Sequence, residues 1–380
     1  MGSQCAAVQM IRLQKNQSAT APCQLFPAKP LTFKKRNGHV PTLVLRLPNW
    51  LGDAVMTLPA VSVLSRMMQE LGGRLAVVAT PQSAALARCL DPGVVQQVVA
   101  ISGAHRKWTR EEMAAIRALE GDYVLLFTNS LRDVLQFRKA GIRRLAGARA
   151  RMRGIFMERS FSFPRRRRHK LNPPHHANRY LAMAYALGAP EWDGKFPVLT
   201  PVKPFELINR EIAALTEHPS LLLLAAGAAY GAGKRWPSLS YREVAAAHVA
   251  EGGIVAVLGS PAEAVIGREI VEGLPETKVF NLCGKTDFSE LIYLMKSARC
   301  MVANDSGLMH LGAALGVPGV AVFGPTDHEA TGPVPAESCE WVVLTDPAPC
   351  TPCFRRTCKS GLACIARVKP QDVIAELKRF

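Results

Sequence analysis

Short, mainly apolar runs alternate along the chain with longer stretches whose apolar residues recur at every third or fourth position. In the first half, the runs lie at 43–47, 75–80, 94–101 and 123–127, and helical patterns lie at 54–71, 83–90, 111–119 and 177–187. In the second half, the runs lie at 221–225, 254–258, 279–282, 300–303, 320–323 and 341–344, with helical patterns such as 241–251, 288–296 and 370–378. Runs without a polar face are typical of strands buried in parallel sheets. The alternation therefore predicts an α/β protein with two doubly wound parallel sheets.

Three segments interrupt this alternation. Residues 1–40 carry Lys and Arg without any Asp or Glu and show no sustained period, so we expect a basic, mobile extension there. The pattern lapses again in the basic block 132–170, and three prolines within 197–204 predict an interdomain linker. We therefore expect domains at 41–200 and 201–380, with a ligand cleft between them at the carboxyl ends of the strands.

The net charge of +17 indicates an anionic partner, which could be nucleic acid, a membrane face or a phosphorylated substrate. No run of about 20 apolar residues and no apolar leader is present, so neither a spanning helix nor a secretory signal is expected. The densest run of charge is Arg165, Arg166, Arg167 and Arg168. This run is either a solvated loop or a surface for an anionic acceptor or lipid headgroups.

A polar turn follows the apolar run 300–303. Asp305, Ser306 and Gly307 stand where the strand gives way to a helix, and His310 lies on the first helical turn. Ser306 can cap that helix, and the free backbone N–H groups there can bind a phosphate, with His310 within reach of a phosphate or sugar. The alternative is an ordinary helix cap followed by a packed histidine.

Two further loops follow strands of the second half. The glycine-rich loop 227–233 ends at Lys234, a compact positive charge suited to a diphosphate. It is not a Walker A loop, because Arg235 takes the hydroxyl position. Glu263 follows the run 254–258 and could bind ribose hydroxyls. The plainer interpretations are that Lys234 is a surface lysine and that Glu263 is an acid favoured at a helix N-terminus.

In the first half, Asp53 stands at the start of a helix just after the run 43–47. An acid is electrostatically favoured at that position, but it could also serve as a general base for an acceptor hydroxyl. No Asp-x-Asp pair is present, so we expect no catalytic metal or other required cofactor. A diphosphate leaving group would then be stabilised by lysine and helix dipoles.

The tail contains a cluster of four cysteines, Cys350, Cys353, Cys358 and Cys364. Their spacing permits a structural zinc ion, an iron–sulfur cluster or no metal at all.

With these motifs in this order, the chain from about 43 to 380 resembles glycosyltransferase family 9, which holds the lipopolysaccharide heptosyltransferases. The motifs that carry the resemblance lie at 45–53, 234–237, 282–286, 304–310 and 324–327, and their spelling is most similar to the heptosyltransferase II branch. The resemblance implies the GT-B fold, with two Rossmann-like domains facing a central cleft. It further implies an acceptor-binding domain at 41–200 and a nucleotide-sugar-binding domain at 201–380.

The family's reaction is metal-independent, inverting transfer of a heptose from ADP-heptose to the inner core of lipopolysaccharide. The resemblance thus implies an anionic lipid A–Kdo–heptose acceptor and a cytoplasmic enzyme at the inner face of the inner membrane. By matching positions, Asp53 is the expected base, Lys234 binds the diphosphate and Glu263 binds the ribose. Phosphate and sugar contacts are expected from Asp305, Ser306, Gly307 and His310.

Two alternatives stay open at this point. One is a GT-B transferase for another nucleotide-sugar or acceptor. The other is a basic nucleic-acid-binding protein, for which charge is the sole argument. Aromatic residues make up 7% of the chain and do not interleave with the arginine run, which disfavours a single-strand stacking platform. We therefore expect no nucleic-acid partner.

Overall fold

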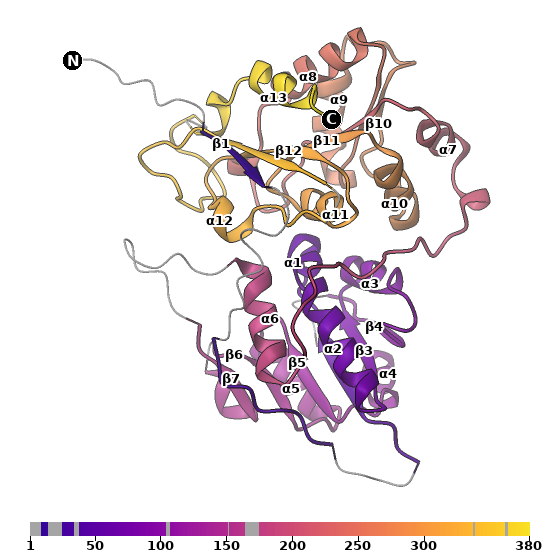
Figure 1. Ribbon diagram of the computed structural model, residues 1–380, viewed down its shortest axis with the longest axis vertical. Helices are drawn as coiled ribbons and strands as arrows, with labels where there is room; N and C mark the ends of the chain where they lie inside the picture. The colour runs from indigo at the N-terminus through magenta and orange to yellow at the C-terminus, as the bar shows by residue number, and fades with distance from the viewer. Residues whose placement is uncertain are drawn as a thin grey trace. The chain divides into compact units, whose positions relative to one another are not determined.

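A computed structural model describes residues 9–13, 25–33, 38–103, 107–150, 152–163, 175–336, 339–361 and 364–380. The chain forms two compact units (Figure 1). The N-terminal unit lies within Ser18–Thr200, and the C-terminal unit comprises Pro201–Phe380 together with the strand β1 (Gln9–Leu13). Among the residues described, no helix has the length and apolar character needed to cross a bilayer.

The N-terminal unit contains a six-stranded, wholly parallel sheet. Its strands in spatial order are β4 (Gln97–Ala100), β3 (Arg74–Ala79), β2 (Thr42–Arg46), β5 (Tyr123–Leu126), β6 (Leu145–Ala148) and β7 (Arg159–Phe161). The central strand β2 pairs with both neighbours, so that Leu43 lies opposite Leu75 and Tyr123. The connections run one way from β2 to β4 and the other way from β5 to β7. Such a reversal leaves a crevice at the carboxyl ends of β2 and β5.

The helices of this unit are α1 (Leu51–Met56), α2 (Leu58–Glu70), α3 (Pro81–Arg88), α4 (Arg110–Ala118), α5 (Leu131–Lys139) and α6 (His176–Ala186). The single helix expected at 54–71 is thus two helices that meet at Thr57. Pro59 explains the break, because its ring tolerates the first turn of α2 but not the interior of a longer helix.

The C-terminal unit contains a seven-stranded sheet. Its strands in spatial order are β1, β13 (Trp341–Thr345), β12 (Gly319–Phe323), β11 (Cys300–Asn304), β8 (Leu221–Ala225), β9 (Ile254–Val257) and β10 (Val279–Asn281). All pairs are parallel except β1 with β13, and the connections reverse between β8 and β11. The two Rossmann-like sheets confirm the expected fold class.

The helices of the C-terminal unit surround a core that contains the fully buried Trp236, Tyr241 and Phe323. They are α7 (Arg210–Thr216), α8 (Ser238–Ala250), α9 (Ala264–Val271), α10 (Phe288–Ser297), α11 (Gly307–Ala314), α12 (His328–Thr331) and α13 (Pro370–Leu377).

Within the residues that the structure describes, two segments expected to be irregular contain regular structure. The first lies within 1–40, where β1 adds an antiparallel edge strand to β13 and the backbone N–H of Leu31 donates to the Leu187 carbonyl. A parallel sheet leaves unpaired N–H and C=O groups at its edge, and β1 satisfies them. The second concerns the basic block, which contains α5, β6 and β7. The strands β6 and β7 are too short to show a period.

Candidate functional site

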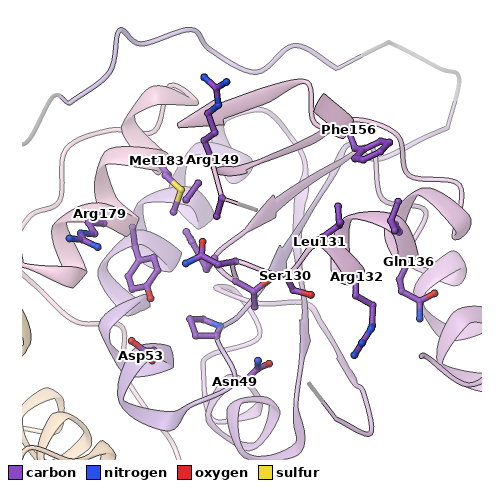
Figure 2. Close-up of a pocket in the computed structure, with 18 of the residues that line it drawn as sticks. Asn49, Asp53, Ser130, Leu131, Arg132, Gln136, Arg149, Phe156, Arg179 and Met183 are labelled. Atoms are coloured by element: carbon purple, nitrogen blue, oxygen red, sulfur yellow. The ribbon is translucent and has the colours of Figure 1, made fainter. Parts of the chain in front are cut away.

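The switch point of the N-terminal unit carries a hollow of about 1600 Å³ (Figure 2). Its lining comes from the residues that follow β2, β5 and β6, together with one side of α6. Asn49 and Asp53 follow β2, Ser130 follows β5 and Arg149 follows β6. Because parallel strands bring their carboxyl ends to one edge, these residues converge although they are far apart in sequence.

Asp53 lies in the first turn of α1 and lines this hollow. Its side chain is 34% exposed, and its Oδ1 lies 3.9 Å from Nδ1 of His176, the first residue of α6. One turn along α6, the partly buried Tyr180 lines the same hollow. Burial first, and the negative charge of Asp53 second, raise the pKa of Tyr180 well above its ordinary value. Asp53 is thus a solvent-accessible carboxylate inside a concave site.

The rest of the lining is strongly basic. Seven cationic residues face the hollow: Lys107, Arg132, Arg138, Lys139, Arg143, Arg149 and Arg179. Asp53 is the one carboxylate among the described lining residues. Burial lowers the pKa of Arg179, so this charge is partly desolvated. Clefts lined by one sign of charge concentrate ligands of the opposite sign, so the hollow suits an anionic molecule.

A buried charged network supports the floor of the hollow. Arg46 at the end of β2 forms an ion pair with Asp133 of α5, with Nε and Oδ2 3.2 Å apart. Its Nη2 donates to Oδ1 of Asn49 at 2.7 Å, which fixes the loop before Asp53. Burial lowers the pKa of Arg46, and the Asp133 carboxylate opposes that shift.

A second buried arginine, Arg153, donates to the Ala148 and Thr128 carbonyls. Burial lowers its pKa to about 10. Neither Arg153 nor Arg46 is predictable as a supporting residue from periodicity. The one signal available is a charged residue inside the apolar run 43–47.

The C-terminal unit brings together the two motifs that follow β8 and β11, the strands at its own switch point. Nζ of Lys234 donates to Oδ2 of Asp305 at 2.6 Å, and both side chains are largely buried. The side-chain Oδ1 of Asn304, the last residue of β11, accepts hydrogen bonds from the backbone N–H of Trp236 at 3.1 Å and from the Tyr241 hydroxyl at 2.9 Å. These bonds fix the backbone of both loops, so the ammonium and the turn at Asp305 have defined positions.

Glu263 stands beside the same glycine-rich loop. Its carboxylate accepts from Ser260 N–H at 2.7 Å and Ser260 Oγ at 2.8 Å, in a capping box. The carboxylate packs against Gly227, where any side chain would overlap it. The structure therefore brings Glu263 to the loop that carries Lys234, while Ser260 already engages one of its oxygens.

The turn after β11 differs in one respect from expectation. Ser306 occupies the N-cap position of α11, but its hydroxyl makes no capping hydrogen bond. Its Oγ is buried without a partner in the described part of the chain, as is Oγ1 of Thr326, which follows β12. Gly307 is the first residue of α11, and His310, three residues further along the helix, is buried. Two unsatisfied buried hydroxyls at the carboxyl edge of one sheet are consistent with a site for a polar ligand.

Two predicted groups are not tested by the structure. Arg165, Arg166, Arg167 and Arg168 lie outside the described residues. Of the tail cysteines, Cys350 and Cys358 are exposed and Cys364 is buried. Within the described ranges, no group of three or more His, Cys, Asp or Glu side chains is placed to hold a metal ion. Metal binding by the tail stays a prediction.

Comparison with known proteins places these features in context. Residues 111–363 match the sequence model of glycosyltransferase family 9 (heptosyltransferase). The chain is 29% identical over 300 residues to lipooligosaccharide heptosyltransferase 2 of Haemophilus influenzae, which covers 76% of this chain and 84% of that protein. It is 36% identical over 166 residues to lipopolysaccharide heptosyltransferase 2 of Salmonella typhimurium, covering 41% of this chain and 47% of that protein.

Two solved structures from Escherichia coli share the fold. The ADP-heptose lipopolysaccharide heptosyltransferase II matches with a TM-score of 0.69 and 23% identity over 89% of this chain and 98% of that one. The heptosyltransferase WaaC, solved with ADP, matches with a TM-score of 0.65 and 17% identity over 89% of this chain and 99% of that one.

Proposed function

The chain belongs to glycosyltransferase family 9, and we propose that it transfers a heptose from ADP-heptose to the inner core of lipopolysaccharide. The observation that carries this proposal is one accessible carboxylate, Asp53, inside a large and otherwise basic hollow. An acceptor rich in phosphates and carboxylates would be held by the cations, which would leave Asp53 free to meet a sugar hydroxyl.

In the proposed reaction, Asp53 takes the proton of an acceptor hydroxyl. The oxygen of that hydroxyl forms a bond to the anomeric carbon of the heptose on the face opposite the diphosphate. The bond between that carbon and the phosphate oxygen breaks, and its electron pair leaves with ADP. The configuration at the anomeric carbon is inverted, and Asp53 then releases its proton to solvent.

We assign donor binding to the C-terminal unit. Lys234 would meet the diphosphate, the turn from Asp305 to Gly307 would offer backbone N–H groups, and Glu263 would meet the ribose. His310 would help to orient the sugar end. Charge stabilisation by lysine and backbone dipoles is the means by which we propose that ADP departs without a catalytic metal.

The overall charge fits an enzyme that works at a surface. The net charge of +17 would draw the protein to the anionic leaflet in which the acceptor is anchored. Each basic residue near such a leaflet contributes about 1 kcal/mol, so a few of them permit reversible docking. We therefore propose a peripheral enzyme at the cytoplasmic face of the inner membrane.

The test is release of ADP from ADP-heptose in the presence and absence of a lipid A–Kdo–heptose acceptor. We expect acceptor-dependent ADP release together with an acceptor that is heavier by one heptose in mass spectrometry. The proposal fails if ADP-heptose is not consumed, or if another nucleotide-sugar is used much faster with the same acceptor.

A further inference from the structure

The cysteine-rich segment 350–358 packs directly on the loop that carries Lys234. The Gly233 N–H donates to the Arg356 carbonyl at 2.8 Å, and the Tyr230 hydroxyl donates to the Phe354 carbonyl at 2.8 Å. A Cβ atom at Gly231 would lie 2.5 Å from the Arg356 carbonyl oxygen, so glycine is required for this close approach. The two backbones are therefore fitted to each other.

The same segment also reaches a second loop at the carboxyl edge of the sheet. The Phe354 N–H donates to the Pro325 carbonyl at 2.9 Å, and Pro325 follows β12. The segment thus joins the loops after β8 and β12, and backbone hydrogen bonds hold it at Phe354 and Arg356. Side chains on it have a defined position relative to Lys234.

Contact with the ring of Tyr230 brings two cations together. Nζ of Lys234 lies 5.0 Å from the ring centroid, and Cζ of Arg356 lies 5.3 Å from the same centroid. Both distances are within the range of cation–π attraction, which offsets part of the repulsion between the two charges. Such an arrangement of like charges is favourable when an anion binds beside them.

The charge balance at the site favours a second cation. The ammonium of Lys234 is paired with the Asp305 carboxylate at 2.6 Å, so this pair has no net charge. Arg356 is exposed, and no carboxylate pairs with it in the part of the chain that the structure describes. A nucleoside diphosphate carries at least two negative charges, and a guanidinium binds phosphate oxygens in a bidentate manner.

We propose that Arg356, held by Tyr230 and by the backbone of the glycine-rich loop, is a second donor-binding cation that contacts the diphosphate of the nucleotide-sugar. This inference rests on the proposed function, and it gives the cysteine-rich segment a role in the donor site. Arg356 supplies the positive charge that the Lys234–Asp305 pair lacks.

The experiment measures the affinity of the full chain for ADP and for adenosine by calorimetry. Arg356→Ala should weaken the affinity for ADP by roughly ten-fold or more, as expected for the loss of a charge-assisted hydrogen bond. The affinity for adenosine should not change. Arg356→Lys should retain part of the affinity. Arg355→Ala is the matched control, because it removes an equal charge from the adjacent exposed position, and it should leave ADP affinity within about two-fold.

A structural role would give a different pattern. Tyr230→Phe keeps the ring and loses the hydroxyl bond, so it should retain ADP affinity, whereas Tyr230→Leu should lose it to the same extent as Arg356→Ala. Equal ADP affinity in Arg356→Ala and wild type would overturn the inference and leave the proposed function intact. Equal losses for ADP and adenosine, or equal losses in Arg355→Ala, would also overturn it. Failure of wild type to bind ADP would instead refute the proposed function.

Discussion

Replacement of Lys234 by methionine removes an ammonium and keeps a side chain of similar length. The Nζ of Lys234 lies 2.6 Å from Oδ2 of Asp305, and the two side chains are 14% and 6% exposed. At this distance and an effective dielectric constant of about 20, the Coulomb attraction is about 6 kcal/mol, from which the desolvation of both groups must be subtracted. Loss of one partner leaves the carboxylate buried and unpaired. We expect Lys234→Met to lower the free energy of unfolding of the C-terminal unit by about 3 kcal/mol.

The double variant Lys234→Met/Asp305→Asn separates stability from donor binding. It has no unpaired charge, so its thermal midpoint should recover most of the roughly 6–12 °C that the single variant loses. Its KM for ADP-heptose should stay as high as in the single variant, since neither protein offers the ammonium to the diphosphate. Scanning calorimetry and steady-state ADP release measure the two quantities. If the double variant regains donor affinity together with stability, Lys234 acts only through Asp305, and the assignment of its ammonium to the diphosphate is wrong.

Three further predictions concern other parts of the structure. Gly227→Ala should displace the Glu263 carboxylate that it would overlap, and should therefore raise the KM for ADP-heptose while leaving kcat nearly unchanged in the ADP-release assay. Asp133→Ala should leave the buried Arg46 guanidinium without its ion-pair partner and lower the stability of the N-terminal unit by about 3 kcal/mol, measured by urea unfolding. Iodoacetamide at about pH 8 should label the exposed thiols Cys350 and Cys358 first, as read by peptide mass spectrometry. Burial raises the pKa of three other thiols to about 11 and keeps them protonated: Cys283, Cys300 and Cys339.

The sheets were predictable because strands buried on both faces must be apolar along their whole length. The run 221–225 became β8 without any change of boundary, and 300–303 gained a single residue in β11. The strands β6 and β7 escaped prediction because they have only four and three residues, among them a glycine in β6 and an arginine in β7. No period can be read from so few positions.

The positions of the single site residues at the sheet edge were predictable from the sequence, but the contacts between these residues were not. Lys234 and Asp305 both follow apolar runs, so their proximity to a sheet edge could be inferred from the sequence. That they form an ion pair depends on β8 and β11 being neighbours, which sequence order does not specify. The packing of Arg356 on Tyr230 likewise joins residues far apart in the chain, and it needs glycine at positions where any side chain would block the approach.

The central claim is that Asp53 is the base of a heptosyl transfer. The most direct measurement is the single-turnover rate of heptose transfer for wild type and Asp53→Asn, with ADP affinity measured on the same samples. The surface variant Asp193→Asn serves as the control, because Asp193 lies away from the lining of the hollow. We predict a rate lower by about 10²–10⁴-fold in Asp53→Asn with ADP affinity unchanged, since general bases contribute by factors of that size. A transfer rate in Asp53→Asn close to that of wild type and of the control would contradict the claim.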